Sequence, residues 1–426
     1  MSVSFSGVRA LEILDSRGRP TLSVTVELAG GVVASAGVPS GASTGTREAV
    51  ELRDGDKSRF GGAGVLNAVG HVNGEIADFL VGHSFGSLAE VDEALAGVDG
   101  TPNKSRLGAN ALVGVSMATA RAAALAEGKE LFDWLPGWGA GQRLPVPCFN
   151  VLNGGAHAPN ALDFQEFMVC PVGATSMAEA VRAGAEVYAA LRSGLQAQGM
   201  ATGLGDEGGF APELAEPEEV LALIVAAIEK AGYPVGRDGV MIALDPAASE
   251  FRQADGRYRV NGVMLSSDEM IERYAAMVDR FPVWSIEDGL GEDDRDGWVK
   301  LTQRLGDKIQ LVGDDNFCTN PAIIADAIKA GIGNAALIKL NQIGSVTETL
   351  EAMRLCHGAG YGQMVSHRSG ETPDSFIADL VVATGCGQIK TGAPARGERV
   401  AKYNRLLEIA AARPELPFGL PGGVLR

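Results

Sequence analysis

Three acidic residues each follow a short apolar run in the second half of the sequence. Asp245 ends "MIALD", Glu287 ends "VWSIE", and Asp314 follows "IQLVG". If these runs are neighbouring strands of a parallel barrel, the carboxylates meet at the carboxyl ends of the strands, where barrel enzymes carry their active sites. Any one of them alone is more simply explained as a helix cap or turn residue. Three carboxylates at equivalent strand ends predict a cation site, because they repel one another unless a cation lies between them. Their oxygen atoms, with no His or Cys among them, are ligands that suit Mg²⁺.

Lys339 interrupts the apolar run "NAALIKLNQIG", where an unpaired ammonium is costly to bury. We therefore expect its side chain to face the barrel interior, near the acids. Burial beside a divalent cation can lower the pKa of a lysine, which would make Lys339 a general base. A structural ion pair with one of the acids is the alternative, and Lys339 by itself does not decide between them.

Cationic and hydroxyl side chains follow the last two predicted strands. Arg368 and Ser369 lie in "VSHRSGET" beside His367, and Lys390 lies in "GQIKTGAP". A planar guanidinium, a hydroxyl and a compact ammonium together suit a phosphate group, which TIM barrels commonly bind at their last strands. A surface salt-bridge cluster is the alternative, but it does not explain why glycines flank both groups.

Two glycine-rich loops carry further polar groups. "GLGDEGGFAP" holds Asp206 and Glu207 in a backbone too flexible for a helix, so this segment is a loop. "NGGAHAPNALDFQEFMV" holds His157 in a similar loop, with Gln165 and Glu166 at the start of a strand. Acidic loops usually stay solvated and a lone His is usually structural. The shared loop type nevertheless makes both loops candidates for the same site.

Strands and helices in alternation must position these side chains. Short apolar runs recur at spacings of about 25 to 40 residues, close to the roughly 30 residues of a βαβ unit. Such a chain forms an open doubly wound sheet or a closed barrel. No G-x-G-x-x-G opens a helix after a strand, which disfavours a dinucleotide-binding sheet and favours the barrel. The predicted strands lie at residues 240–244, 283–286, 309–312, 335–340, 362–365 and 387–389.

The first third of the chain has a different pattern. Residues 2–39 alternate short apolar runs with turn residues, which predicts an antiparallel meander. From residue 47 to 134 the apolar period becomes helical, so the two stretches predict a compact α+β domain. The Gly- and Pro-rich stretch 136–147 marks a boundary. We expect an N-terminal domain at 1–135 and a barrel domain at 136–426.

Composition restricts the class of protein. The formal charge of −17 opposes nonspecific binding to nucleic acid or anionic lipid, because both need a basic surface. Five scattered cysteines, none in a C-x-x-C pair, argue against a disulfide framework and against a zinc site. No signal-peptide run opens the chain, and the longest apolar run, residues 221–228, is too short to cross a membrane. The protein is expected to be cytoplasmic.

The motifs of this chain together resemble the enolase family of bacterial type, the phosphopyruvate hydratases. The resemblance extends over essentially the whole chain. It implies an α/β protein with an N-terminal α+β domain and a TIM barrel in the order ββαα(βα)₆, whose first strands include an antiparallel one. It also implies reversible, Mg²⁺-dependent dehydration of 2-phosphoglycerate to phosphoenolpyruvate in glycolysis and gluconeogenesis. The motifs are "SGAST", "NGGAHAPN", "QEFM", "GDEGGFAP", "LDPAASEF", "SIEDG", "GDD", "IKLNQIG", "SHRSGET" and "IKTGAPARGER".

Carried over residue by residue, the resemblance implies a role for each candidate. Lys339 would remove the C2 proton, and Glu207, with Glu166 nearby, would assist departure of the C3 hydroxyl. Two Mg²⁺ ions would bind during turnover. The implied metal ligands are Asp245, Glu287 and Asp314 for the structural ion, and Ser40, in a mobile closing loop, for the second. His157 and His367 are also implied to be catalytic residues that line the pocket. The implied substrate-binding residues are Arg368, Ser369, Lys390, Lys339, Gln165, Glu166 and His157.

The resemblance also implies an assembly and leaves some positions unusual. Members of the family form homodimers, and some form octamers, so a homo-oligomer is expected. Pro246, Pro159 and Thr46 depart from the residues usual at these places. None is a catalytic position, so the departures concern loop geometry and closure.

Two other functions remain open at this stage. A related metal-dependent barrel could abstract a proton from a different carboxylate, as a racemase or an acid-sugar dehydratase does, although the predicted phosphate site and the Ser40 loop count against this. A noncatalytic binding or structural role on the same scaffold is the other. It would be favoured by loss of the base or of a ligand, and here Lys339, Glu207 and the three acids are all present.

Overall fold

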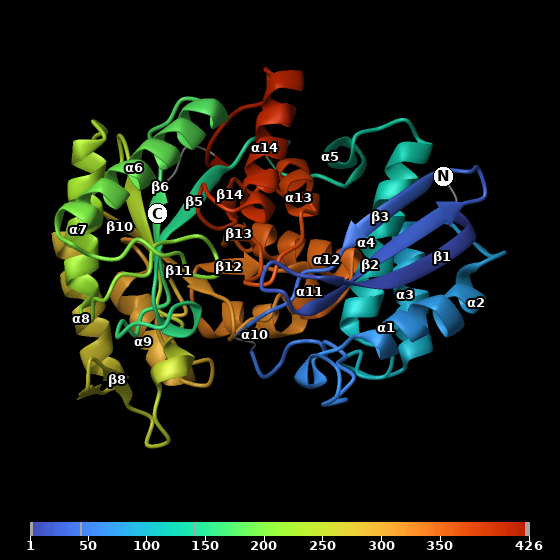
Figure 1. The fold of residues 1–426 in the computed structure, drawn as a ribbon, viewed down its shortest axis with the longest axis horizontal. Coiled ribbons are helices and arrows are strands. Elements are labelled where there is room, and N and C mark those ends of the chain that lie inside the picture. Colours follow the sequence, from blue (N-terminus) through green and yellow to red (C-terminus); the bar gives the residue numbers. More distant parts are fainter. Residues whose placement is uncertain (1–2, 43–44, 140, 422–426) are drawn as a thin grey trace.

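The computed structural model describes residues 3–42, 45–139 and 141–421. Figure 1 shows two parts side by side, an N-terminal sheet with its helices and a larger barrel ringed by helices. The α+β part and the barrel that the sequence predicts are therefore both present. Ser43 and Thr44 of the "SGAST" motif lie outside the described residues.

The N-terminal part is built on an antiparallel meander, as predicted. Its sheet has the order β3-β2-β1-β4, and alternate residues of β2 (Leu22, Val24 and Val26) are fully buried on one face. This period of two is what a half-buried strand requires. The strands are β1 Val3–Leu14, β2 Pro20–Leu28, β3 Val33–Gly37 and β4 Ser84–Phe85.

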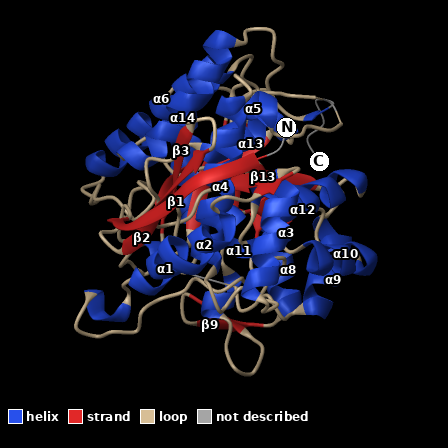
Figure 2. Ribbon diagram, turned by 90° about the vertical axis from the view of Figure 1, so that its right-hand side faces the viewer, coloured by secondary structure: helices blue, strands red, loops and turns tan. Residues whose placement is uncertain are grey.

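Helices cover one side of this sheet. Figure 2 shows the strands as a layer beside the helices, and α4 packs on β2 and β3. The helical segments are η1 Phe60–Gly62, α1 Leu66–His71, η2 Val72–Ile76, α2 Ala77–Leu80, α3 Leu88–Asp99, α4 Ala109–Ala126 and α5 Leu131–Trp134.

The prediction of helix from residue 47 onward is wrong for its first part. Residues 47–59 form turns and irregular backbone, and the first helical turn begins at Phe60. This segment pairs its backbone with distant parts of the chain instead, because the Ala49 N–H donates to the Gln342 carbonyl oxygen at 2.8 Å. Tertiary contacts have outweighed the local helical period.

The helix α4 is apolar enough to resemble a membrane span by length and composition. However, 83% of its apolar window is buried inside the fold. Nearly every face of the helix contacts protein, so its hydrophobicity is that of a core helix.

The barrel is closed by eight strands in the order β10-β11-β12-β13-β14-β5-β6-β7. β6 runs antiparallel to both of its neighbours, and the other described pairs of the barrel are parallel. The six strands predicted from apolar runs are all present within a residue or two of their expected limits. The strands are β5 Val146–Asn153, β6 Glu166–Cys170, β7 Met241–Asp245, β10 Val283–Glu287, β11 Gln310–Gly313, β12 Ala335–Ile338, β13 Gly362–Ser366 and β14 Gln388–Lys390.

Two helices follow the first strand pair, and each later strand is followed by a helix, which confirms the order ββαα(βα)₆. Several helices begin at a side-chain cap; Ser266, for example, forms a capping box with Glu269 before α8. The helices are α6 Met177–Ala197, α7 Pro217–Lys230, α8 Ser267–Arg280, α9 Arg295–Leu305, α10 Pro321–Ala330, α12 Val346–Gly358, α13 Phe376–Thr384 and α14 Gly397–Ala412. The shorter elements are η3 Gly155–His157, η4 Ala248–Phe251, α11 Leu340–Ile343 and the hairpin β8 Tyr258–Val260 with β9 Val263–Leu265.

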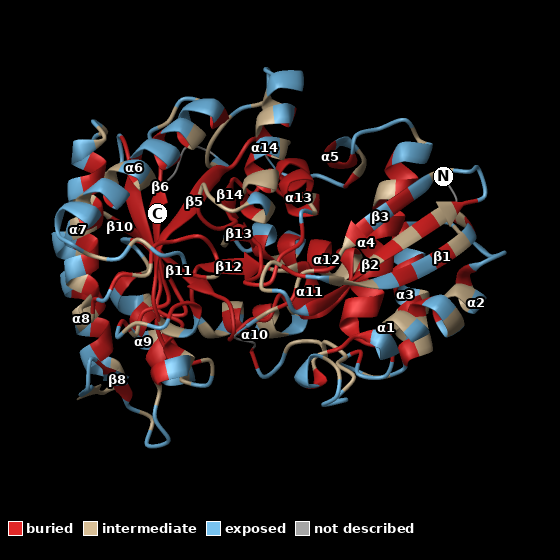
Figure 3. Cartoon of the chain, in the orientation of Figure 1, coloured by how far each residue is buried: buried red, intermediate tan, exposed pale blue. Residues whose placement is uncertain are grey.

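The core lies inside the barrel and between the barrel and its helices. Figure 3 shows the barrel strands buried along their length, with the surrounding helices exposed on their outer face. An apolar cluster that includes Met168, Ala243 and Leu337 fills the middle of the barrel. This packed layer closes the barrel to water and leaves the carboxyl ends of the parallel strands as its mouth.

Candidate active site

The three predicted acids stand at the barrel mouth on adjacent strands. Asp245 and Glu287 are the last residues of β7 and β10, and Asp314 directly follows β11. All three are buried, with at most 7% of each residue exposed. The strand-end argument from the sequence therefore placed them correctly in the fold.

Two lysines lie among these acids. The Lys390 ammonium is 2.9 Å from Asp245 Oδ2 and from Glu287 Oε1, and 3.1 Å from Glu166 Oε1. The Lys339 ammonium is 2.5 Å from Asp314 Oδ2. The sequence expectation was a lowered pKa for Lys339 beside a divalent cation. Burial is the largest influence and opposes the ammonium, but the charges of Asp314 and Glu287 act against it, and the pKa of Lys339 is raised above its ordinary value.

The acids still carry more negative charge than the lysines balance locally. Burial raises the pKa of Glu287 well above its usual range, and the neighbouring charge of Asp245 raises it further. A carboxylate in such a position is stabilised by a further cation. The donor atoms that Asp245, Glu287 and Asp314 offer are all carboxylate oxygens, the ligands that Mg²⁺ prefers. The site therefore fits a hard divalent cation.

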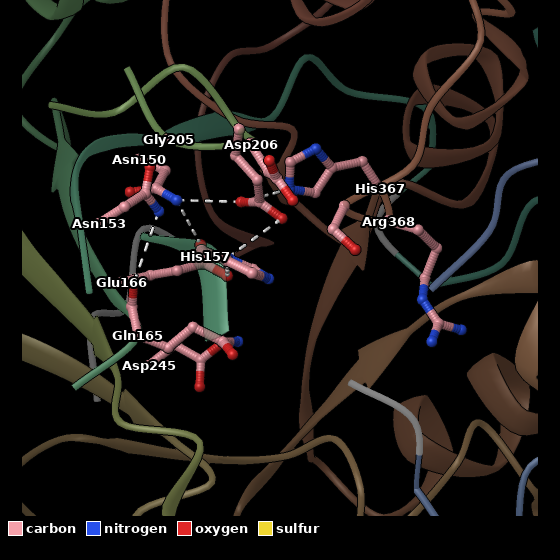
Figure 4. A network of polar contacts seen from close by, with 12 residues as sticks. Asn150, Asn153, His157, Gln165, Glu166, Gly205, Asp206, Asp245, His367 and Arg368 are labelled. Atoms are coloured by element: carbon pink, nitrogen blue, oxygen red, sulfur yellow. Dashed lines mark hydrogen bonds and ion pairs between the residues drawn. The ribbon is translucent and has the colours of Figure 1, made fainter. Parts of the chain in front are cut away.

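A second acidic group adjoins the first at the mouth, and Figure 4 labels two of its members, His157 and Glu166. Ligand atoms of His157, Glu166 and Glu207 all lie within 4.8 Å of one another. Glu166 reaches the mouth from the start of β6 only because that strand is antiparallel to its neighbours. Burial, and then the charge of Glu207, raise the pKa of Glu166 well above its usual range. Two carboxyl groups this close favour holding one proton between them.

His367 contacts Glu207 from the strand β13 side. Arg399 can only donate, so its contact with His367 Nδ1 at 2.5 Å leaves the ring proton on Nε2. His367 Nε2 lies 3.0 Å from Glu207 Oε2. Burial lowers the pKa of His367 to about 3, and Arg399 contributes in the same direction. The imidazole is therefore neutral near pH 7 and presents an N–H to Glu207.

The glycines of "GLGDEGGFAP" allow the Glu207 loop to press against β5. A Cβ on Gly209 would lie 2.6 Å from Asn153 Oδ1 and 2.9 Å from the Leu152 backbone nitrogen. Gly208 adopts a φ of +89°, a backbone conformation that residues with a side chain rarely adopt. The sequence could show only that this segment was a loop. The structure shows that close packing requires glycine there.

Arg368 and Ser369 also line the mouth, but their polar groups are engaged with protein. The Arg368 guanidinium lies 3.0 and 3.1 Å from the two carboxylate oxygens of Glu48. Ser369 Oγ accepts from Arg17 at 3.2 Å. The predicted phosphate-binding cations thus face carboxylates in this arrangement: Arg368 faces Glu48, and Lys390 faces the strand-end acids.

Ser40 is the candidate that the structure does not bring to the acids. It is fully buried, and it pairs with Gly370 through two backbone hydrogen bonds of 2.8 Å. Its Oγ accepts from Arg53 at 2.8 Å and donates to Glu51 at 3.2 Å. Ser40 must leave these partners before its Oγ can reach a cation at the mouth.

The other candidates gather around one small cavity. Its free volume is about 20 Å³, roughly that of a single water, so side chains fill most of the mouth. Gln165 is buried there, and its Oε1 has no hydrogen-bond partner among the described residues. The lining residues are His157, Gln165, Glu166, Glu207, Asp245, Lys339, Ser366, His367, Arg368, Ser369 and Lys390.

Sequence reasoning missed several residues that hold this site. Asp288 accepts the backbone N–H groups of Asp314 and Asp315, each at 2.9 Å. Asn150 contacts the two glutamates, and Glu48 contacts Arg368. The acid pair in "SIEDG" was the signal for Asp288. Asn150 gave none, because it lies within a strand that reads as core.

Comparison with known proteins agrees with this geometry. Residues 5–135 match the family described as enolase, N-terminal domain, and residues 141–415 match that described as enolase, C-terminal TIM barrel domain. The enolase of Rubrobacter xylanophilus is 57% identical over 404 residues, which cover 94% of this chain and 93% of that relative. The chain therefore belongs to the enolase family.

Proposed function

We propose that this pocket dehydrates 2-phosphoglycerate to phosphoenolpyruvate, with Lys339 as the base and Glu207 as the group that assists loss of the hydroxyl. The family assignment carries the activity. The roles are supported by one observation, that a buried lysine and a buried carboxyl pair line the same cavity from different segments of the barrel domain. Base and acid on separate sides of one substrate are what a stepwise dehydration needs.

A metal cofactor follows from the family, and we propose two Mg²⁺ ions per site. The residues that would hold the first are Asp245, Glu287 and Asp314, whose oxygens and unbalanced charge fit a hard cation. We propose Ser40 for the second, after it leaves Arg53 and Glu51. Bound Mg²⁺ would stabilise the doubly charged carboxylate that forms when the C2 proton is lost. The combination of a lysine base with Mg²⁺ is a known pattern of this superfamily.

The chain's own groups then carry the protons. Neutral Lys339 takes the C2 proton, so its ammonium must first part from Asp314 and lose a proton. The electron pair left at C2 forms the C2–C3 double bond while the C3–O bond breaks. The hydroxyl leaves as water with a proton from the Glu166–Glu207 pair, in which the pKa of Glu166 is raised by burial and by the charge of Glu207, whereas His367 and His157 lower the pKa of Glu207.

The charged ends of the substrate would be held by the remaining candidates. Arg368, Ser369 and Lys390 supply a fork, a hydroxyl and an ammonium for phosphate or carboxylate. Because Glu48 lies on Arg368 in this arrangement, the substrate anion must displace that carboxylate. His157, Gln165 and His367 would complete the pocket wall.

We further propose a cytoplasmic homo-oligomer, at least a dimer, with a domain boundary at residues 135–136. Membership of the enolase family supports this. Sedimentation of the purified protein measures the assembly directly.

The function is tested by adding 2-phosphoglycerate to the purified protein and following ultraviolet absorbance as the conjugated product forms. We expect an increase that needs Mg²⁺ and stops with a chelator. Racemisation or dehydration of other 2-hydroxy acids, without action on 2-phosphoglycerate, would instead support a related barrel enzyme. No turnover of any of these would support the noncatalytic alternative.

A further inference from the structure

Asn150 lies between the two glutamates of the site and contacts both. It belongs to β5 and is fully buried. Its Nδ2 atom donates to Glu166 Oε2 and to Glu207 Oε2, each at 3.0 Å, as Figure 4 shows for the labelled residues. Both hydrogens of the amide are therefore used on carboxyl oxygens from two different segments of the chain.

This contact bridges groups that otherwise repel. Glu166 starts β6, and Glu207 lies in the glycine-rich loop, so the backbone does not hold their side chains at a fixed separation. His157 Nδ1 is also near both, but at 3.7 and 3.8 Å it is beyond hydrogen-bond distance. Hydrogen bonds to ionised acceptors are about twice as strong as neutral ones, so the Asn150 amide is a strong link between them.

The surroundings hold the amide in one orientation. A Cβ on Gly209 would lie 3.1 Å from Asn150 Oδ1, so the loop backbone packs closely against the carbonyl side. Turning the amide over would direct Oδ1 at two carboxyl oxygens, which is unfavourable. Asn150 therefore presents its two N–H groups, and not its oxygen, to the acids.

We propose that Asn150 is a positioning residue that holds Glu166 and Glu207 together for the loss of the C3 hydroxyl and takes no part in removal of the C2 proton. The inference rests on the proposed function. Lys339 follows β12, and β13 and β14 separate that strand from β5 in the barrel. No described hydrogen bond joins Asn150 to Lys339 or to the three strand-end acids. The two half-reactions should therefore respond differently when Asn150 is changed.

The test compares two rates in one enzyme at saturating 2-phosphoglycerate and Mg²⁺. Exchange of the C2 proton with D₂O, followed by proton NMR, reports the base step, and product absorbance reports the complete dehydration. Asn150→Asp keeps the shape but replaces both donors with a third carboxylate. We expect dehydration to fall by about 10²-fold or more while exchange stays within about threefold of wild type, given the usual size of acid–base contributions.

A second variant keeps the test valid if Asn150→Asp does not fold. Asn150→Ser retains one hydroxyl proton, which can bond only one of the two acids, so we expect a smaller change in the same ratio. The matched control is Asn334→Asp. Asn334 is a buried amide that donates to the carbonyls of Gly306 and Ile309 at 2.9 and 3.0 Å, away from the mouth. The Asn334→Asp variant should have a lower free energy of unfolding but an unchanged ratio of exchange rate to dehydration rate.

The outcomes separate this inference from the function it rests on. If the wild-type protein shows neither exchange nor dehydration, the proposed function is wrong. If the wild type shows both, and the Asn150 variants lose both in parallel or neither, then the function stands and the positioning role is overturned.

Discussion

The two ends of the barrel carry different kinds of buried polar residue on the same set of strands. At the carboxyl end, Asp245, Glu287 and Asp314 are buried close to one another, and Glu287 has a raised pKa. At the amino end, Gln310 and Gln388 begin β11 and β14 and exchange two amide hydrogen bonds of 2.9 and 2.8 Å. The carboxyl end gathers negative charges that repel one another, whereas the amino end carries a pair of neutral amides that bond to each other.

The difference shows which end of the barrel is electrostatically unfavourable without a ligand and which end stabilises the fold. A neutral amide pair loses little on burial, because each donor meets an acceptor. Buried like charges are unfavourable unless a ligand or metal balances them, so their presence marks the functional end. In barrels of this type, the carboxyl end carries the chemistry and the amino end carries stability. Variants at each end should therefore change different measurements.

Lys339→Ala should have the largest effect. Without the base we expect turnover to fall by about 10⁴-fold, the upper end of general acid–base contributions, with Mg²⁺ binding largely kept. Stopped assays of product and calorimetric Mg²⁺ titration measure the two quantities. The control is Lys104→Ala, which removes a buried lysine that is paired with Glu348 at 2.9 Å and does not line the cavity at the mouth. A Lys339 variant that kept half its rate would exclude it as the base.

Glu207→Gln should lower the overall rate less than Lys339→Ala does, and it should affect only one of the two steps. We expect dehydration to fall by about 10²- to 10³-fold while exchange of the C2 proton with solvent continues, because the glutamine cannot give a proton to the leaving hydroxyl. Proton NMR in D₂O measures the exchange. Loss of exchange together with dehydration would contradict separate roles for Glu207 and Lys339.

Much of this contrast could be predicted from the sequence, and the missing part has a physical cause. Strand period and spacing are local properties of a sequence, so the sequence could predict that Asp245, Glu287 and Asp314 stand at the ends of neighbouring strands. Contacts between distant segments have no local pattern. Glu48 and Arg368 lie 320 positions apart, and the pattern near Glu48 predicted a helix that does not form.

The pairing of each lysine illustrates the same limit. The sequence predicted that Lys339 lies near the acids, and it left open whether an ion pair would form. It grouped Lys390 with Arg368 as a phosphate cradle, whereas the structure places Lys390 among the strand-end acids. Which carboxylate faces which ammonium depends on side-chain directions around the closed barrel, and these follow from packing that strand spacing does not determine.

Asp288→Asn should weaken Mg²⁺ binding at the carboxyl end of the barrel, with a smaller effect than the two preceding variants have on the rate. Asp288 accepts two backbone N–H groups beside Asp314, and the asparagine would turn an N–H toward one of them. Its φ of +42° is one that Asn tolerates, so the backbone should survive. We expect Mg²⁺ affinity to fall by about 10- to 100-fold, as for other groups that orient metal ligands.

Calorimetric Mg²⁺ titration and the Mg²⁺ dependence of the rate both measure this change. The matched control is Asp293→Asn on the surface, where 75% of the side chain is exposed, and this variant should bind Mg²⁺ normally. Unchanged Mg²⁺ affinity in Asp288→Asn would show that the Asp314 loop holds its position without Asp288.

Gln388→Leu should have the smallest effect on activity and a measurable one on stability. The change leaves the buried Gln310 amide without its partner, which lowers the free energy of unfolding by about 1 to 3 kcal/mol. Replacing Gln310 with leucine as well removes the orphaned amide, so the double variant should recover part of that loss. Urea unfolding of the two single variants and the double variant gives the coupling energy, and kcat per folded molecule should stay at the wild-type value throughout. If kcat fell with stability intact, the neutral end would be linked to the chemistry at the mouth, and the division between the two ends would not hold.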